Sequence, residues 1–228
     1  MAAPVVVATP NLSTYGSSSS ATLNMPTPRP SGSLYLGVIG RDDDDFTFDA
    51  VSGWTNFLFD SAFNGSGSGS ALVTWHEGVA SEPVSYNFPI TGGGNEESTS
   101  GCVEITGADN TTPLGTVGAK NEGTSTTAKA LAFNASSSDS IIISVYFCDS
   151  ANFTSVNDGT EILRHTSANA GNVQLAMSWA ASPGAGNTTG NSTATLGSDD
   201  WVAWKFEVKS ASVGGGGGEL LLMMKNYQ

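Results

Sequence analysis

The sequence predicts an all-β protein, specifically a jelly-roll-like antiparallel β-sandwich. Charged residues make up only 13% of the chain, so the Glu, Lys and Arg side chains that favour helices are scarce. Short apolar runs alternate with stretches of Gly, Ser, Asn and Asp, which is typical of strands joined by turns. No window repeats its apolar residues with the 3.6-residue period that an amphipathic helix requires.

Residues 1–30 are predicted to be an N-terminal extension that contains short strands. The run "PVVVATP" indicates one strand, and a weaker alternation in residues 13–23 indicates another. The stretch "PTPRP" follows. Because proline fixes the backbone, this stretch is predicted to be a stiff, extended connector into the main body.

The main body, residues 31–209, is predicted to form the sandwich, from two sets of strands. In each set, apolar runs are separated by turn-forming stretches such as "RDDDD", "NGSGSGS" and "SPGAGN". The first set is expected at 34–39, 54–59, 71–75, 84–90 and 102–105. The second set is expected at 128–133, 141–147, 161–164, 173–179, 191–196 and 201–208.

The two sets follow one another in a similar order, which indicates an internal duplication. Ile141 and Phe153 follow Leu34 and Phe46 at the same separation along the chain. One such unit is too small to close a good core, so the two halves are expected to share one sandwich. Chance similarity between two β-rich segments is the alternative. The predicted pseudo-repeats are 31–107 and 138–209.

Residues 210–228 are predicted to be a flexible Gly-rich linker followed by an apolar C-terminal arm. Five consecutive glycines precede the arm. Apolar side chains on a tether are a liability in a free monomer, so we expect them to be covered. The arm either folds back as an edge strand or docks on a neighbouring subunit or partner. The candidate partner-binding residues are Leu220, Leu221, Leu222, Met223 and Met224.

The charge of the chain predicts which partners it avoids. Its formal net charge of −13 repels nucleic acids and anionic membranes, so neither is an expected partner. No apolar run reaches the length of a membrane-spanning helix. The first residues lack the basic and apolar regions of a signal peptide, so we expect synthesis in a host cytoplasm without Sec-type export.

The sequence predicts no enzyme. His76 stands beside Glu77, but adjacent strand residues point to opposite faces of a sheet. His165 lies at another predicted strand end, and no catalytic role is expected for it. Glu104 and Glu207 occupy matching places in the two sets, which repeat architecture explains better than a catalytic carboxylate pair. No catalytic or cofactor-binding residue is therefore predicted.

An acidic turn is the one candidate for a metal site. Clustered carboxylates suit Ca²⁺, but the spacing here does not match an EF-hand loop. A solvated turn is the preferred interpretation, so the prediction is no cofactor and no metal, with Ca²⁺ as the open alternative. The candidate ligands are Asp42, Asp43, Asp44 and Asp45.

The cysteines and tryptophans are expected to serve packing. Cys102 and Cys148 each lie in an apolar stretch, which favours buried free thiols over a disulfide framework. Trp75 and Trp179 close similar strands of the two sets, so core or rim packing is expected. Stacking on a sugar is the alternative for exposed tryptophans.

These motifs together resemble a β-sandwich module of tailed-phage structural proteins and of some bacterial surface proteins. The resemblance covers about 31–209. It departs from the module at Ser33, Thr106 and Leu114, where Asp, an aromatic-Ser pair and Ile are usual. The matching residues are Leu34, Tyr35, Leu36, Gly53, Trp54, Trp75, Glu82, Pro83, Tyr86, Phe88, Gly107, Asp109, Pro113, Asp200, Trp201 and Val202.

The resemblance implies a virion or surface setting and carries no catalytic residues. Together with the acidic surface and the tethered arm, it predicts a virion structural protein of a tailed bacteriophage, most specifically a capsid decoration or cement protein. The expected partners are phage capsid or tail proteins and further copies of the chain, in a trimer. The alternative is a receptor- or carbohydrate-binding module of a phage tail or bacterial surface.

Overall fold

In the part of the chain that the structure describes, the regular secondary structure is β-strand apart from one short 3-10 turn. The computed structural model describes residues 3–44, 46–65, 69–92, 94–165 and 173–211. These residues form three antiparallel sheets and one 3-10 turn, η1 (Phe63–Gly65). The prediction of an all-β, antiparallel fold is therefore confirmed.

The first sheet, here called the N-sheet, takes all its strands from the first half of the chain. Neighbouring strands are antiparallel throughout. In spatial order it contains β1 (Val5–Ser18), β8 (Glu96–Thr106), β3 (Leu34–Arg41), β6 (Ser70–Glu77) and β5 (Trp54–Asp60).

The second sheet, the C-sheet, takes all its strands from the second half. In spatial order it contains β10 (Asn121–Ala130), β15 (Ser192–Val208), β11 (Ile141–Cys148), β14 (Gln174–Ala181) and β13 (Thr160–Arg164). Two short strands also pair with β15: β9 (Leu114–Val117) and β12 (Phe153–Val156).

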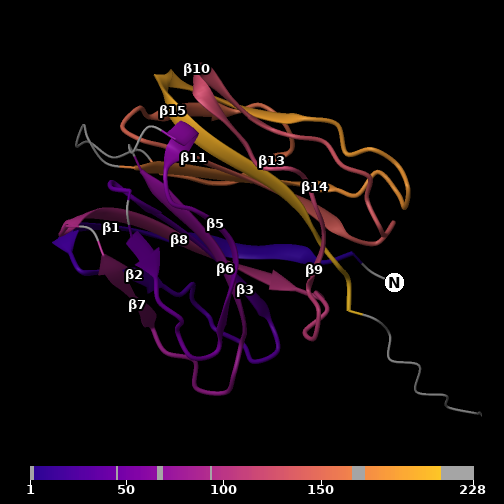
Figure 1. The fold of residues 1–228 in the computed structure, drawn as a ribbon. Helices are drawn as coiled ribbons and strands as arrows, with labels where there is room; N and C mark the ends of the chain where they lie inside the picture. Colours follow the sequence, from indigo (N-terminus) through magenta and orange to yellow (C-terminus); the bar gives the residue numbers. More distant parts are fainter. Residues whose placement is uncertain (1–2, 45, 66–68, 93, 166–172, 212–228) are drawn as a thin grey trace, which may run out of the picture.

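A third, smaller sheet covers the N-sheet and is called the cover sheet. It contains β2 (Ser20–Asn24), β7 (Ser85–Gly92) and β4 (Phe46–Phe48). In Figure 1 the C-sheet lies above the N-sheet, while β2 and β7 lie on the other side of the N-sheet. The molecule is therefore layered in the order cover sheet, N-sheet, C-sheet.

Two apolar cores hold the three layers together. The main core lies between the inner faces of the N-sheet and C-sheet, where Leu36 and Val103 of one sheet meet Ile143 and Phe206 of the other. The second core lies between the N-sheet and the cover sheet. The central strand β3 is buried at every residue because an apolar core lies on each of its faces. The central strand β11 is also buried throughout, and a third apolar cluster, which includes Tyr146 and Phe153, packs on the outer face of the C-sheet.

The predicted strands of the main body all overlap observed strands, with two differences. The predicted strands at 191–196 and 201–208 are one continuous strand, β15. The short strands β4, β9 and β12 were not predicted. In the N-terminal extension, the strand predicted at 5–7 lies at the start of β1, a long edge strand of the N-sheet, and the weaker signal at 13–23 spans the end of β1 and most of β2.

Candidate functional site

Polar side chains gather on the outer faces of the two sheets, the faces turned away from the main core. On the outer face of the N-sheet, His76 projects from β6 and is only 4% exposed. Its Nδ1 lies 2.7 Å from the carbonyl oxygen of Gly53, and its Nε2 lies 3.1 Å from both carboxylate oxygens of Glu82. The imidazole is stacked against the rings of Trp54 and Tyr35. Every side of His76 is therefore occupied by the protein.

Glu82 is the partner that the sequence did not indicate for His76. The turn after β6, in which Ser81 has a positive φ of 65°, folds the chain back and brings Glu82 to the ring. Burial by itself raises the pKa of Glu82, but hydrogen bonds from Tyr86, the Val79 N–H and His76 outweigh it and lower the pKa below its usual value. These hydrogen bonds thus keep the carboxylate ionised and hold it in place beside His76.

Glu77 does not take part in this cluster. It is exposed and pairs in register with Leu34, on the other face of β6 from His76. His165 also lies apart from His76, after β13 of the C-sheet. Its Nδ1 is 3.0 Å from the side-chain oxygen of Gln174, and its Nε2 is 2.6 Å from the hydroxyl of Thr14.

The two sheets carry a serine–glutamate hydrogen bond at matching positions. Ser33 donates to Glu104 over 2.7 Å, and Ser140 donates to Glu207. All four side chains are buried. Glu104 pairs with Tyr35 in the N-sheet, and Glu207 pairs with the matching residue of β11 in the C-sheet. The sequence prediction that the two glutamates occupy matching places agrees with this register.

Glu207 holds a loop as well as a serine. Burial raises the pKa of Glu207, but its hydrogen bonds to Ser136, Ser140 and Ser137 lower the pKa below the usual value. The loop before β11 is thereby tied to the end of β15. The donors are the N–H groups of Thr116, Ser136 and Ser137 and the hydroxyls of Ser136 and Ser140.

Two acidic turns meet at one end of the sandwich. Burial, together with Glu96 and Glu97, raises the pKa of Asp42 to about 6. Burial, together with Asp199 and Asp42, raises the pKa of Asp149 to about 7. Asp42 follows β3 and Asp149 follows β11, so each carboxyl lies just beyond a central strand. The two sheets thus place like charges close together.

The acidic turn that the sequence offered as a metal candidate is only partly described. Asp42, Asp43 and Asp44 lie in the described part of the chain, and Asp45 lies outside it. The Asp43 carboxylate accepts a hydrogen bond from the Gly94 N–H at 3.0 Å. Among the described residues, no group of three or more His, Cys, Asp or Glu side chains is arranged to hold a metal ion.

The cysteines and tryptophans lie in packed surroundings, as predicted. Cys102 and Cys148 are free and buried, and burial raises the pKa of each thiol. Trp75 and Trp179 are half-buried against the main core. The other three tryptophans are buried: Trp54, Trp201 and Trp204.

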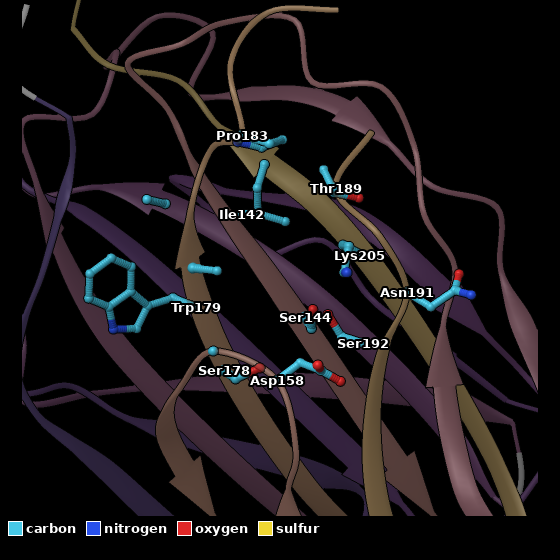
Figure 2. A pocket seen from close by; sticks show the side chains of 13 residues that line it. Ile142, Ser144, Asp158, Ser178, Trp179, Pro183, Thr189, Asn191, Ser192 and Lys205 are labelled. Carbon is cyan, nitrogen blue, oxygen red and sulfur yellow. The ribbon is translucent and has the colours of Figure 1, made fainter. Parts of the chain in front are cut away.

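A pocket of about 240 Å³ opens on the outer face of the C-sheet. Lys205 of β15 lies in the middle of its lining, with Ser144 of β11, Ser178 of β14 and Ser192 below it in Figure 2. Lys205 is 2% exposed, and burial lowers its pKa to about 8. Asp158, in the turn between β12 and β13, also lines the pocket. The sequence did not predict this site, because a single lysine between the aromatic residues of a strand matches no binding motif.

A tight turn forms the wall that carries Asp158. Gly159 has a φ of +82°, and a Cβ there would lie 2.4 Å from the carbonyl oxygen of Trp179. Only glycine lets the turn approach β14 so closely. In Figure 2 the ring of Trp179 lies to one side of the pocket, away from the hydroxyl groups, in keeping with its contacts to the main core.

The predicted partner-binding residues of the C-terminal arm, 220–224, lie outside the described residues. The described part of the chain contains no helix with the length and hydropathy needed to cross a membrane. Comparison of the chain with protein-family models, with curated proteins and with solved structures finds no match in any of the three.

Proposed function

We propose that this chain is a non-enzymatic virion structural protein of a tailed bacteriophage, specifically a capsid decoration protein. The observation that carries the proposal is the way the two halves form one scaffold. The N-sheet and C-sheet have the same strand order, position by position, and pack face to face over one core. Such a scaffold suits a protein whose task is mechanical, and it accords with the sequence resemblance to phage structural modules.

We further infer that the two sheets arose by internal duplication. Leu34 pairs with Ile105, and Ile141 pairs with Val208, so the registers of the central strands correspond. The serine–glutamate bonds of Ser33 and Ser140 also correspond. The jelly-roll-like path stays a prediction, because each of these two sheets takes its strands from one half of the chain.

The disposition of the histidines supports a structural role over an enzymatic one. His76 is enclosed by aromatic rings and by Glu82, and His165 is bonded to Gln174 and Thr14. A general base needs access to a substrate proton. These hydrogen bonds instead link separate strands and turns.

The disposition of the tryptophans favours decoration over the alternative of a carbohydrate-binding module. Sugar stacking requires an aromatic face that is open to solvent. All five tryptophans are described, and each is buried or packed against the main core. The adhesin alternative would therefore need another kind of contact surface.

The acidic surface and the C-terminal arm suggest how the protein would bind its particle. In this proposal the arm adds itself to a neighbouring copy or shell protein, forming an oligomer that we expect to be a trimer. In the same proposal, the five glycines before the arm act as the linker that lets it reach a neighbour. The charge of −13 keeps unassembled copies apart at low salt.

The test compares the full chain with a chain that lacks residues 214–228. Sedimentation velocity would measure the oligomer, and co-sedimentation with purified phage particles would measure binding. A second variant of full length replaces residues 220–224 with serine and keeps the glycines, so that it tests the apolar side chains alone. We expect the full chain to associate and bind particles, and both variants to lose both properties. Unchanged association of the truncated chain would contradict the role of the arm, and failure of the full chain to bind particles would contradict decoration.

A further inference from the structure

Lys205 is a buried cation that the protein itself compensates only weakly. An ammonium group carries three N–H donors, but only the carbonyl oxygen of Gly190, 2.9 Å away, accepts from Lys205 among the described residues. Lys205 also forms no ion pair with any residue that the structure describes. Removing an ammonium from water costs several kcal/mol unless partners replace the water.

The surroundings of Lys205 are rich in hydroxyl groups. Ser144, Ser178 and Ser192 line the same pocket and are themselves buried. Tyr146 lies two residues from Ser144 on the same face of β11; burial raises the pKa of its hydroxyl, and hydrogen bonds with Ser144, Ser192 and Ser178 act against that rise. The pocket therefore places a positive charge beside several groups that can donate hydrogen bonds.

The matching face of the N-sheet shows that this scaffold can fill the same place with apolar atoms. By register, Gly37 and Cys102 stand where Ser144 and Lys205 stand in the C-sheet. A Cβ on Gly37 would lie 2.6 Å from the Leu23 side chain, so that face is closely filled by the cover sheet. The open, polar pocket in the C-sheet is therefore a feature of this sheet and not a consequence of the strand order.

We propose that the pocket binds a small oxyanion, a carboxylate or inorganic phosphate, through the ammonium of Lys205 and the hydroxyls of Ser144 and Ser192. An oxyanion supplies acceptors for the unused N–H donors and a counter-charge for the buried cation. The volume of about 240 Å³ lies below the usual range for drug-sized ligands, about 300–1,000 Å³, so the ligand is small.

Asp158 is the other titratable group of the lining. It is exposed, and its Oδ2 already accepts a hydrogen bond from the Thr193 N–H at 2.9 Å. Because Lys205 titrates near pH 8, the oxyanion should bind at pH 6.5–7 and should be released as the pH rises to about 9.5. The charge of Asp158 acts against burial to raise the pKa of Lys205, and it repels an anion that enters the same pocket.

The first test is calorimetric titration of the full chain with sodium acetate and, separately, with sodium phosphate at pH 6.5–7. Sodium chloride at matched ionic strength and glucose are the controls. We expect acetate, phosphate or both to bind, and the oxyanion that binds identifies the source. Lys205→Met should weaken this affinity at least about tenfold, whereas the exposed-site control Lys129→Met should leave it unchanged.

A second measurement uses the unmodified chain and does not depend on a variant that folds. An amine-acetylating reagent is applied with and without the oxyanion, and mass spectrometry follows Lys205 and Lys129. We expect the oxyanion to slow acetylation of Lys205 several-fold and to leave Lys129 unaffected. Binding of neither oxyanion, equal binding to Lys205→Met, or an unchanged acetylation rate at Lys205 would overturn the proposal.

Discussion

The outer faces of the N-sheet and C-sheet occupy matching positions but are covered in different ways. On the N-sheet, Leu23 and Phe88 of the cover sheet pack over the face together with Trp54 of β5, and they leave room only for glycine at residue 37. On the C-sheet, no third sheet is present among the described residues; an apolar cluster covers part of the face, and a pocket remains around Lys205. One strand order thus supports both a closed apolar layer and a polar cavity.

This difference shows which features belong to the scaffold and which belong to one half. The face-to-face core and the serine–glutamate bonds occur in both halves, so they belong to the scaffold. The His76 cluster and the Lys205 pocket occur in one half each. Matching substitutions at scaffold positions should therefore lower the free energy of unfolding in both halves. Matching substitutions on the outer faces should affect the two halves to different extents.

The largest effect is expected from placing a lysine on the closed face. Cys102 is fully buried, and its Sγ lies 3.8 Å from the sulfur of Met25. Cys102→Lys buries an unpaired charge there, which should lower the free energy of unfolding by about 3–5 kcal/mol. Lys205→Met, the matching change on the open face, should alter it by less than about 1 kcal/mol. Urea denaturation measures both, and equal losses would show that the two faces do not differ in this way.

The next effect compares the two buried glutamates. Glu207→Ala frees the donors of the loop before β11 and should cost about 3 kcal/mol, since buried donors are left unsatisfied. Glu104→Ala frees the Ser33 hydroxyl and should cost about 1–2 kcal/mol. Hydrogen exchange of Ser136 and Ser137 should rise in the first variant alone. A larger loss for Glu104→Ala would contradict the assignment of Glu207 as the main anchor.

A smaller effect is expected from two single variants, Gly37→Ser and Ser144→Gly, each of which takes the residue found at the matching position of the other sheet. Gly37→Ser introduces a Cβ at 2.6 Å from Leu23 and 3.1 Å from Trp54, and such overpacking typically costs about 1–3 kcal/mol. Ser144→Gly borders the open pocket and should cost less than about 1 kcal/mol. Thermal unfolding of the two variants side by side is the measurement. Tolerance of Gly37→Ser would mean that the closed face is less tightly filled than the structure shows.

The smallest effect concerns the acidic end, where the two halves meet. The folded-state pKa of Asp149 is raised to about 7, so the native state holds its proton more tightly than the unfolded chain. Stability should therefore fall as the pH rises from about 4 to about 7. Asp149→Asn should remove this fall and add less than about 1 kcal/mol at pH 8, because the site is half-exposed. Denaturation midpoints of Asp149→Asn and of the unmodified chain at pH 5 and pH 8 test this prediction. A variant that is more stable than the unmodified chain only at pH 5 would contradict it.

The sequence predicted those features of the fold that depend on residues close together in the chain. Apolar alternation located the strands of both sheets, and the matching places of Glu104 and Glu207 could be predicted from order along the chain. The burial of Trp75 and Trp179 against the core also followed from their strands. The single strand β15 was split in prediction, because "GSDD" in its middle has the composition of a turn.

The polar sites could not be predicted, since they depend on contacts between distant segments. His76 was considered with its sequence neighbour Glu77, yet the turn at Ser81 brings Glu82 to it instead. Lys205 stands in "WVAWKFEV", where an isolated charge gives no sign that a pocket lies over it. Its environment is set by the turn at Gly159 and by the segment before β15, which are distant in sequence.

The most direct test of the proposed function is the copy number of this chain in purified phage particles, measured by quantitative mass spectrometry against the major shell protein. A decoration protein should be present in a fixed, near-stoichiometric ratio to the shell protein. A few copies per particle would instead place the chain on the tail and favour the adhesin alternative. Absence from particles would contradict a virion role altogether.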